Sequence, residues 1–216
     1  MRKTFRSLAT STLIVAATTT HAASPLPTLN IDKTQTTVSG LSSGGFMANQ
    51  LGYAYSGTFK GVGVFAGGPY MCAGHSNYTA CMYNATVSAG MLSTMQADLN
   101  NWSGTSIDNK ANVANQKIFM FVGNSDSTVG PNPMNAVQTQ YANNGVGAAN
   151  LDYVKRASTA HVFPTDFDST GNNACSSTSE SRPPSITCQN VSGILCSAAS
   201  STMPFCSIHF RSSRSL

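Results

Sequence analysis

Short apolar runs alternate with helical patterns along most of the chain. Strands are predicted over residues 36–39, 61–66, 117–122 and, more weakly, 151–156. Between them, apolar residues recur at helical spacing: Phe46, Met47, Leu51, Ala54 and Tyr55, then Val87, Met91, Leu92, Met95 and Leu99, then Met134, Val137 and Tyr141. Gly57 suits the end of the first helix and Pro133 the start of the third. This alternation predicts an α/β fold with a parallel sheet flanked by helices.

The two ends of the chain differ from this pattern. Arg2, Lys3 and Arg6 precede a short apolar stretch at 8–17, and small residues surround a cut after position 22, as in a secretory signal peptide. Residues 176–216 contain 13 serines and show no steady apolar period. We therefore expect a signal peptide at 1–22, a catalytic domain at 23–175 and a poorly ordered Ser-rich tail at 176–216.

Charge is scarce. Charged residues make up 9% of the chain, against roughly 25% in an average soluble protein. The net charge of +4 comes from the two ends, because residues 23–175 contain six basic and seven acidic side chains and sum to −1. Such a neutral domain cannot attract a polyanion over long range. We expect an uncharged partner, not a nucleic acid or a membrane, and a monomeric protein.

Six cysteines fit an exported protein with disulfides. Cys72 and Cys81 are close enough to close a short loop, and a metal site involving His75 is the less favoured interpretation because no second His or Cys pair accompanies it. The pairing of Cys196 and Cys206 stays open. Four glycosylation sequons begin at Asn77, Asn84, Asn101 and Asn190.

The motif Gly40-Leu-Ser42-Ser-Gly44 follows a predicted strand and precedes a predicted helix. In that setting GxSxG forms a nucleophile elbow, a strained turn that presents the serine hydroxyl above the sheet. Glycines on both sides allow the tight turn without Cβ clashes. Ser42 is thus the candidate nucleophile, and the backbone N–H of Ser43 is a candidate oxyanion donor.

A serine nucleophile needs a histidine base and a carboxylate that orients it. The chain order nucleophile, acid, base leaves His161 or His209 as the base, and His75 is better interpreted as a surface or loop residue. Asp126 directly follows the strand at 117–122 and suits the acid. Four other aspartates suit the role less well: Asp98 and Asp108 lie in helix or turn patterns, and Asp166 and Asp168 are too near His161 in sequence.

Four stretches resemble secreted fungal and bacterial poly(3-hydroxybutyrate) depolymerases of the single-domain, circularly permuted α/β-hydrolase type. They are residues 38–47, 64–72, 121–132 and 161–167, within a resemblance that covers about 28–175. The resemblance implies Ser42 as nucleophile, Asp126 as acid and His161 as base. It also implies disulfides Cys72–Cys81 and Cys175–Cys188.

The resemblance is incomplete in two respects. That family carries a His-Gly-Cys block whose cysteine N–H completes the oxyanion hole, and a tryptophan that lines the polymer cleft. This sequence has no such block, and its single tryptophan is Trp102. The sheet is accordingly expected to be circularly permuted and incomplete.

The sequence therefore predicts a secreted, extracellular serine esterase that cleaves a short-chain aliphatic polyester through an acyl-enzyme, with no metal and no cofactor. Two alternatives stay open. One is a soluble-ester or feruloyl-type esterase on the same scaffold, because the catalytic residues do not distinguish polymers from small esters. The other is an inactive truncated product that lacks the second oxyanion donor.

Overall fold

Four parallel strands form the main sheet, and they follow the same order in space as along the chain. The computed structural model describes residues 27, 29–75, 78–165, 174–178 and 187–189. The strands are β1 (Thr37–Leu41), β2 (Gly61–Phe65), β3 (Lys117–Gly123), β4 (Leu151–Arg156), β5 (Phe163–Thr165) and β6 (Thr187–Gln189). The α-helices are α1 (Ser43–Ala54), α2 (Cys72–His75), α3 (Ala89–Trp102) and α4 (Pro131–Asn143). Short 3₁₀ turns occupy Lys33–Gln35, Tyr78–Cys81, Lys110–Asn115 and Ala148–Asn150.

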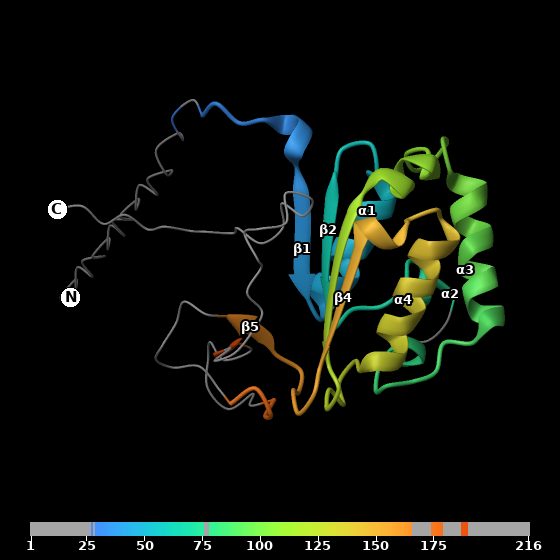
Figure 1. Ribbon diagram of the computed structural model, residues 1–216. Helices are drawn as coiled ribbons and strands as arrows, with labels where there is room; N and C mark the ends of the chain where they lie inside the picture. The colour runs from blue at the N-terminus through green and yellow to red at the C-terminus, as the bar shows by residue number, and fades with distance from the viewer. Residues whose placement is uncertain (1–26, 28, 76–77, 166–173, 179–186, 190–216) are drawn as a thin grey trace, which may run out of the picture. The chain divides into compact units, whose positions relative to one another are not determined.

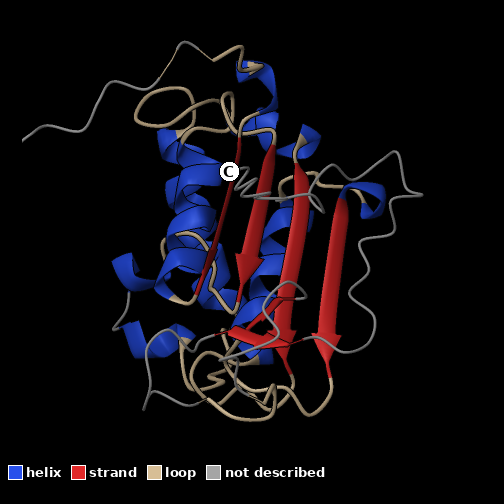
Figure 2. Ribbon diagram, turned by 90° about the vertical axis from the view of Figure 1, so that its left-hand side faces the viewer, coloured by secondary structure: helices blue, strands red, loops and turns tan. Residues whose placement is uncertain are grey.

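The described helices lie on one face of this sheet (Figures 1 and 2). Connections between parallel strands are right-handed in nearly all proteins. Strands added one after another in a constant direction therefore place every connecting helix on the same side. The predicted parallel sheet with flanking helices is confirmed, and all four strands of the main sheet occur close to their predicted positions.

The helix boundaries differ slightly from those predicted, for local reasons. The helix α1 begins at Ser43, before its first apolar residue, because the tight turn at Ser42 leads directly into it. The helix α4 begins at Pro131, two residues before Pro133, since proline at the first helical position loses no intrahelical hydrogen bond. Val87 lies just before α3, whose N-cap Ser88 accepts a hydrogen bond from the Met91 N–H.

Alternation along the strands builds the core on the helix-covered face. Val62, Val64, Ile118 and Met120 are fully buried and pack with side chains of α1 and α4, among them Tyr53, Met134, Val137 and Tyr141. A group of phenylalanines also packs together, with the Phe65 ring contacting those of Phe119, Phe121 and Phe163. Within the described part of the chain, no helix has the length and apolar character to cross a membrane.

A second, two-stranded sheet joins β5 to β6 in parallel. Within the predicted Ser-rich tail, the structure describes residues 176–178 and the strand β6. The rest of that tail lies outside the described residues, as does the predicted signal peptide at 1–22. Whether 23–175 and 176–216 behave as separate regions stays a prediction.

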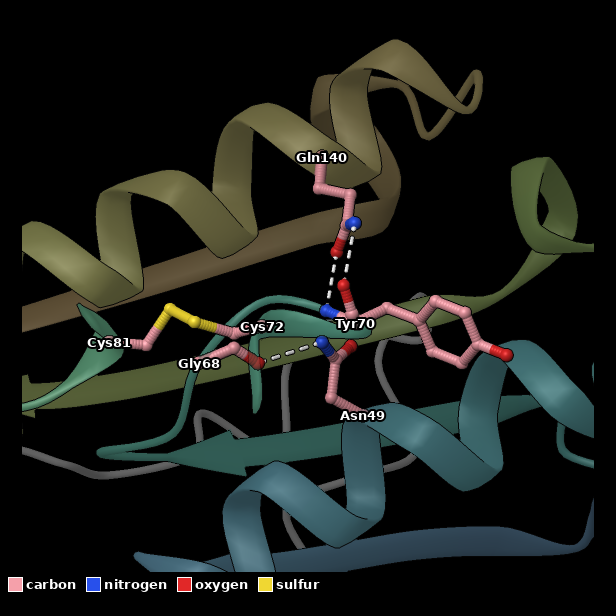
Figure 3. The surroundings of a disulfide bond; sticks show 6 residues. All are labelled: Asn49, Gly68, Tyr70, Cys72, Cys81 and Gln140. Atoms are coloured by element: carbon pink, nitrogen blue, oxygen red, sulfur yellow. Dashed lines mark hydrogen bonds between the residues drawn. A yellow bond between two sulfur atoms is a disulfide. The ribbon is translucent and has the colours of Figure 1, made fainter. Parts of the chain in front are cut away.

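The segment between β2 and α2 is fixed by two buried amide side chains (Figure 3). The side chain of Asn49, on α1, donates a hydrogen bond from its Nδ2 to the Gly68 carbonyl over 2.9 Å. The Gln140 side chain on α4 accepts from the Tyr70 N–H at 2.7 Å and donates to the Tyr70 carbonyl at 3.3 Å. Because these amides bind backbone groups, they hold the path of the chain as it enters the Cys72–Cys81 loop.

The predicted disulfide between Cys72 and Cys81 is present and buried (Figure 3). Cys175 is also disulfide-bonded. Its predicted partner, Cys188, belongs to β6, whose side chains lie outside the described residues, as do Cys196 and Cys206. The Cys175–Cys188 pairing therefore stays a prediction.

We expect that replacing both Cys72 and Cys81 by alanine lowers the free energy of unfolding by about 2–3 kcal/mol. The bond closes a loop across nine residues of separation, and opening it gives the unfolded chain more conformational freedom. Urea unfolding of the variant and of the oxidised wild type measures the difference. Equal unfolding midpoints would show that the loop contributes no stability through this bond.

Candidate active site

Ser42 occupies a strained turn between β1 and α1. Its φ of 57° and ψ of −123° are unusual for a residue other than glycine. The Ser42 N–H donates to the Phe65 carbonyl, and the Ser42 carbonyl accepts from the Phe46 N–H, each over 2.9 Å. The turn is thus secured on both sides, as expected for a nucleophile elbow. Ser43 is the first residue of α1, where the N–H lacks an acceptor within the helix.

Of the two glycines in the GxSxG motif, Gly40 lies too close to neighbouring backbone to carry a side chain, and Gly44 does not. A Cβ on Gly40 would lie 2.3 Å from the Gly44 carbonyl oxygen, whereas one on Gly44 would meet nothing within 4 Å. Gly45 carries the second constraint, since its Cβ would lie 2.6 Å from the Phe65 oxygen. The prediction that both motif glycines relieve Cβ clashes is therefore correct for Gly40 and wrong for Gly44.

Gly40→Ala is expected to lower the free energy of unfolding by at least ~2 kcal/mol, because the added methyl group forces the backbone of the turn apart. Gly44→Ala is the matched control. It should leave stability unchanged or raise it by up to about 1 kcal/mol, since alanine favours helical backbone over glycine. Urea unfolding of the two variants measures the contrast. Similar losses in both would contradict the importance of this backbone contact.

Asp126 and His161 meet as a buried pair. The His161 Nδ1 lies 2.9 Å from Asp126 Oδ2, and because an ionised carboxylate only accepts hydrogen bonds, Nδ1 carries the proton. The Asp126 Oδ1 accepts from the N–H groups of Thr128 and Val129, at 2.8 and 2.9 Å. The structure thus brings together the predicted acid and base, and it leaves the second ring nitrogen of His161 as the one able to take a proton.

The surroundings of Asp126 favour its ionised form. Burial of the carboxyl group raises its pKa, but the hydrogen bonds from His161, Val129 and Thr128, together with the charge interaction with His161, outweigh burial, so the pKa lies below its ordinary value. A carboxylate with a lowered pKa stabilises the fold above its ordinary pKa, and this contribution is lost as pH falls through the folded-state value. At neutral pH, Asp126 is therefore a stable acceptor for the His161 ring.

Ser42 and His161 lie at the same edge of the sheet. The Ser42 N–H binds the carbonyl of Phe65, the last residue of β2, and the ring of Phe65 lies 4.5 Å from that of Phe163. Phe163 follows His161 by two residues and begins β5, near the carboxyl ends of the strands in Figure 1. No hydrogen bond joins the Ser42 hydroxyl to His161 in the part of the chain that the structure describes.

Two hydrogen bonds to residues 174–178 hold the His161 loop, and the sequence did not predict them. The Ala160 N–H donates to the Cys175 carbonyl over 2.7 Å, and the His161 N–H donates to the Thr178 hydroxyl over 3.0 Å. These contacts link the candidate base to a disulfide-bonded segment. No local pattern around residues 174–178 indicates this role, because the contacts join segments that are distant along the chain.

The remaining candidate residues lie elsewhere. His75 pairs with Asp98 between α2 and α3, outside the group formed by Asp126 and His161. Asp108 accepts a hydrogen bond from the Gly57 N–H, in keeping with its predicted turn position. Of the sequons, Asn84 and Asn101 are exposed. Outside the described residues lie His209, Asp166, Asp168, Asn77 and Asn190.

Comparison with known proteins finds related depolymerases. No protein-family model matches the chain. A polyhydroxybutyrate depolymerase from Talaromyces funiculosus is 47% identical over 173 residues, which cover 80% of this chain and 50% of the relative. By sequence, this chain is similar to poly(3-hydroxybutyrate) depolymerases over most of its own length.

Two further relatives show the same similarity. A poly(3-hydroxybutyrate) depolymerase from Delftia acidovorans is 49% identical over 72% of this chain and 31% of its own length. A solved depolymerase with a serine-to-alanine substitution, complexed with an R3HB trimer, is 47% identical, with a TM-score of 0.68 over 74% of this chain and 49% of that one. The fold is thus of the α/β-hydrolase type, like that of the solved depolymerase. The chain spans about half the length of the Talaromyces depolymerase, and less of the Delftia one.

Proposed function

We propose that this protein is a serine esterase that hydrolyses ester bonds of a short-chain aliphatic polyester such as poly(3-hydroxybutyrate). The buried Asp126–His161 hydrogen bond, at the same sheet edge as the strained turn of Ser42, carries the proposal. A histidine held by a carboxylate near an elbow serine is the arrangement that activates a hydroxyl for acyl transfer.

The chemistry follows from these groups. The Ser42 Oγ attacks the ester carbonyl carbon while the His161 Nε2 takes the hydroxyl proton, and the carbonyl oxygen becomes an oxyanion that the Ser43 N–H stabilises. The proton then passes to the leaving alkoxide, so that an alcohol departs and an acyl-enzyme remains. Water, deprotonated by His161, attacks the acyl-enzyme and releases a carboxylic acid and free Ser42. Asp126 keeps the imidazole oriented throughout, and no metal or cofactor enters these steps.

The substrate class is supported by the relatives and by charge. One related depolymerase was solved with an R3HB trimer, and an uncharged polyester suits a region, 23–175, with a net charge of −1. The basic and apolar residues at 1–22 further support secretion to the extracellular space, where glycans on the sequon asparagines and disulfides would form. We also propose that the protein acts as a monomer.

Two substrates test the proposal with one protein preparation. The purified full chain is incubated with a poly(3-hydroxybutyrate) film and, separately, with a soluble nitrophenyl ester. We expect the film to clear with release of soluble hydroxy acids, and the soluble ester to be hydrolysed. Turnover of the soluble ester with an untouched film would favour a small-ester enzyme. Loss of both activities in a folded sample would contradict the esterase proposal.

A further inference from the structure

The segment that follows the Cys72–Cys81 disulfide lies against the loop of the candidate acid. The Tyr83 N–H donates to the Thr128 carbonyl, and the Asn84 N–H donates to the Val129 carbonyl, each over 2.8 Å. Thr128 and Val129 are the residues whose N–H groups bind Asp126. The two segments are separated by more than 40 residues, yet they meet along successive peptide groups.

One peptide group joins both sets of contacts. The carbonyl of Thr128 and the N–H of Val129 belong to the same peptide unit. Its oxygen accepts from Tyr83, and its N–H donates to Asp126 Oδ1 over 2.9 Å. Hydrogen bonds at the two ends of one peptide polarise each other. A displacement of residues 83–84 would therefore move or weaken a donor to the carboxylate.

The side chain of Asn84 adds a second attachment to this loop. Its Oδ1 accepts from the Asn132 N–H at 2.8 Å, and its backbone carbonyl accepts from the Asn132 Nδ2 at 2.9 Å. A Cβ on Gly130 would lie 2.7 Å from the Cβ and the Oδ1 of Asn84. Asn84 thus contacts the loop downstream of Asp126 at Val129, Gly130 and Asn132.

The backbone at this point is strained. Tyr83 and Asn84 have φ values of 54° and 53°, in the left-handed region that non-glycine residues rarely adopt. Asparagine tolerates this conformation better than tyrosine does. Such strain persists only where neighbouring contacts enforce it. Here those contacts are the hydrogen bonds to the loop of Asp126.

We propose that Asn84 is a positioning residue that holds the 128–132 loop, and through it orients Asp126 toward His161. The proposal rests on the esterase function proposed above. Among the described residues no hydrogen bond joins Asn84 to His161 or to the Ser42 hydroxyl, so Asn84 acts through the donors to the carboxylate. The same asparagine begins a glycosylation sequon, which means that loss of its side chain must be separated from loss of a glycan.

Three variants of the full chain make that separation. Asn84→Gly removes the Oδ1 acceptor but keeps a residue that adopts positive φ freely. Asn84→Asp keeps an acceptor oxygen, tolerates the left-handed conformation and cannot be glycosylated. Thr86→Ala destroys the sequon at an exposed position and leaves Asn84 in place. The thermal unfolding midpoint of each variant is measured first. Variants with the midpoint of the wild type have no folding defect, and their activities can be compared directly.

Kinetics on the soluble nitrophenyl ester provide the first measurement. We expect Asn84→Gly to lower kcat about five- to tenfold with KM unchanged, as for the loss of one hydrogen bond. Asn84→Asp should recover most of kcat, and Thr86→Ala should match the wild type. Equal kcat in Asn84→Gly and the wild type, or equal losses in Asn84→Gly and Thr86→Ala, would overturn the proposal.

Proton NMR provides a second measurement that does not depend on turnover. The proton on His161 Nδ1, bound to Asp126, should resonate far downfield in the wild type, in Asn84→Asp and in Thr86→Ala, and should shift or broaden in Asn84→Gly. An unchanged resonance in Asn84→Gly would overturn the positioning role. If the wild type shows this resonance but no turnover, the esterase function fails, and the resonance in Asn84→Gly still decides the role of Asn84.

Discussion

Ser42→Ala is expected to lower hydrolysis of a soluble ester by about 10⁴- to 10⁶-fold. The variant keeps the backbone of the turn but lacks the oxygen that forms the acyl-enzyme, so only binding and oxyanion stabilisation remain. Measured kcat values test this directly. A fluorophosphonate probe, which reacts with activated serines, should label the wild type and fail to label the variant.

Ser93→Ala is a suitable control for this comparison, because Ser93 is an exposed serine on α3, outside the candidate active site. It should keep both the turnover and the labelling of the wild type. Ester hydrolysis that survives in Ser42→Ala at the wild-type rate would show that another group performs the chemistry. Labelling that persists at wild-type extent would point to a different reactive serine.

Asp126→Asn is expected to lower kcat by about 10⁴-fold while the protein stays folded. The N–H groups of Thr128 and Val129 require an oxygen at the Oδ1 position, so the asparagine must direct its NH₂ group at His161. The Nδ1 of His161 then has to accept a hydrogen bond, and the ring proton moves to Nε2. A protonated Nε2 cannot take the proton of the Ser42 hydroxyl.

The Asp126→Asn variant should therefore bind substrate but fail in the chemical step, which steady-state kinetics separates as a loss in kcat. Asp152→Asn is the matched control, because Asp152 is an exposed carboxylate on β4 and outside the candidate active site. It should retain wild-type turnover. Wild-type kcat in folded Asp126→Asn would remove Asp126 from the mechanism, since no other described carboxylate contacts His161.

Several features of the site were predictable because their signals are local. The turn at Ser42 combines a β-prone run, a glycine two residues earlier and a helical pattern directly after it. Asp126 follows the most apolar strand, and the carboxyl ends of parallel strands lie along one edge of a sheet. The choice between His161 and His209, by contrast, rested on a family resemblance, because both histidines fit the chain order of nucleophile, acid and base.

Other features required contacts between distant segments. The constraint on Gly45 arises from the carbonyl of Phe65, on the neighbouring strand, and the sequence around Gly45 does not indicate which strand pairs with β1. The attachment of Asn84 to the loop of Asp126 likewise has no periodicity or spacing that reveals it. From its sequence, Asn84 was a glycosylation candidate alone.

The amino-acid sequence alone determined the alternation of strands and helices, the strained serine turn and the neutral character of the domain. These depend on side-chain periodicity, glycine position and charge, which act over a few residues. Tertiary structure alone decided that His161 meets Asp126, that Gly45 is confined and that Asn84 supports the acid loop. Those contacts depend on the order of strands in the sheet and on hydrogen bonds between segments far apart in the chain, and such bonds leave no pattern in either segment by itself.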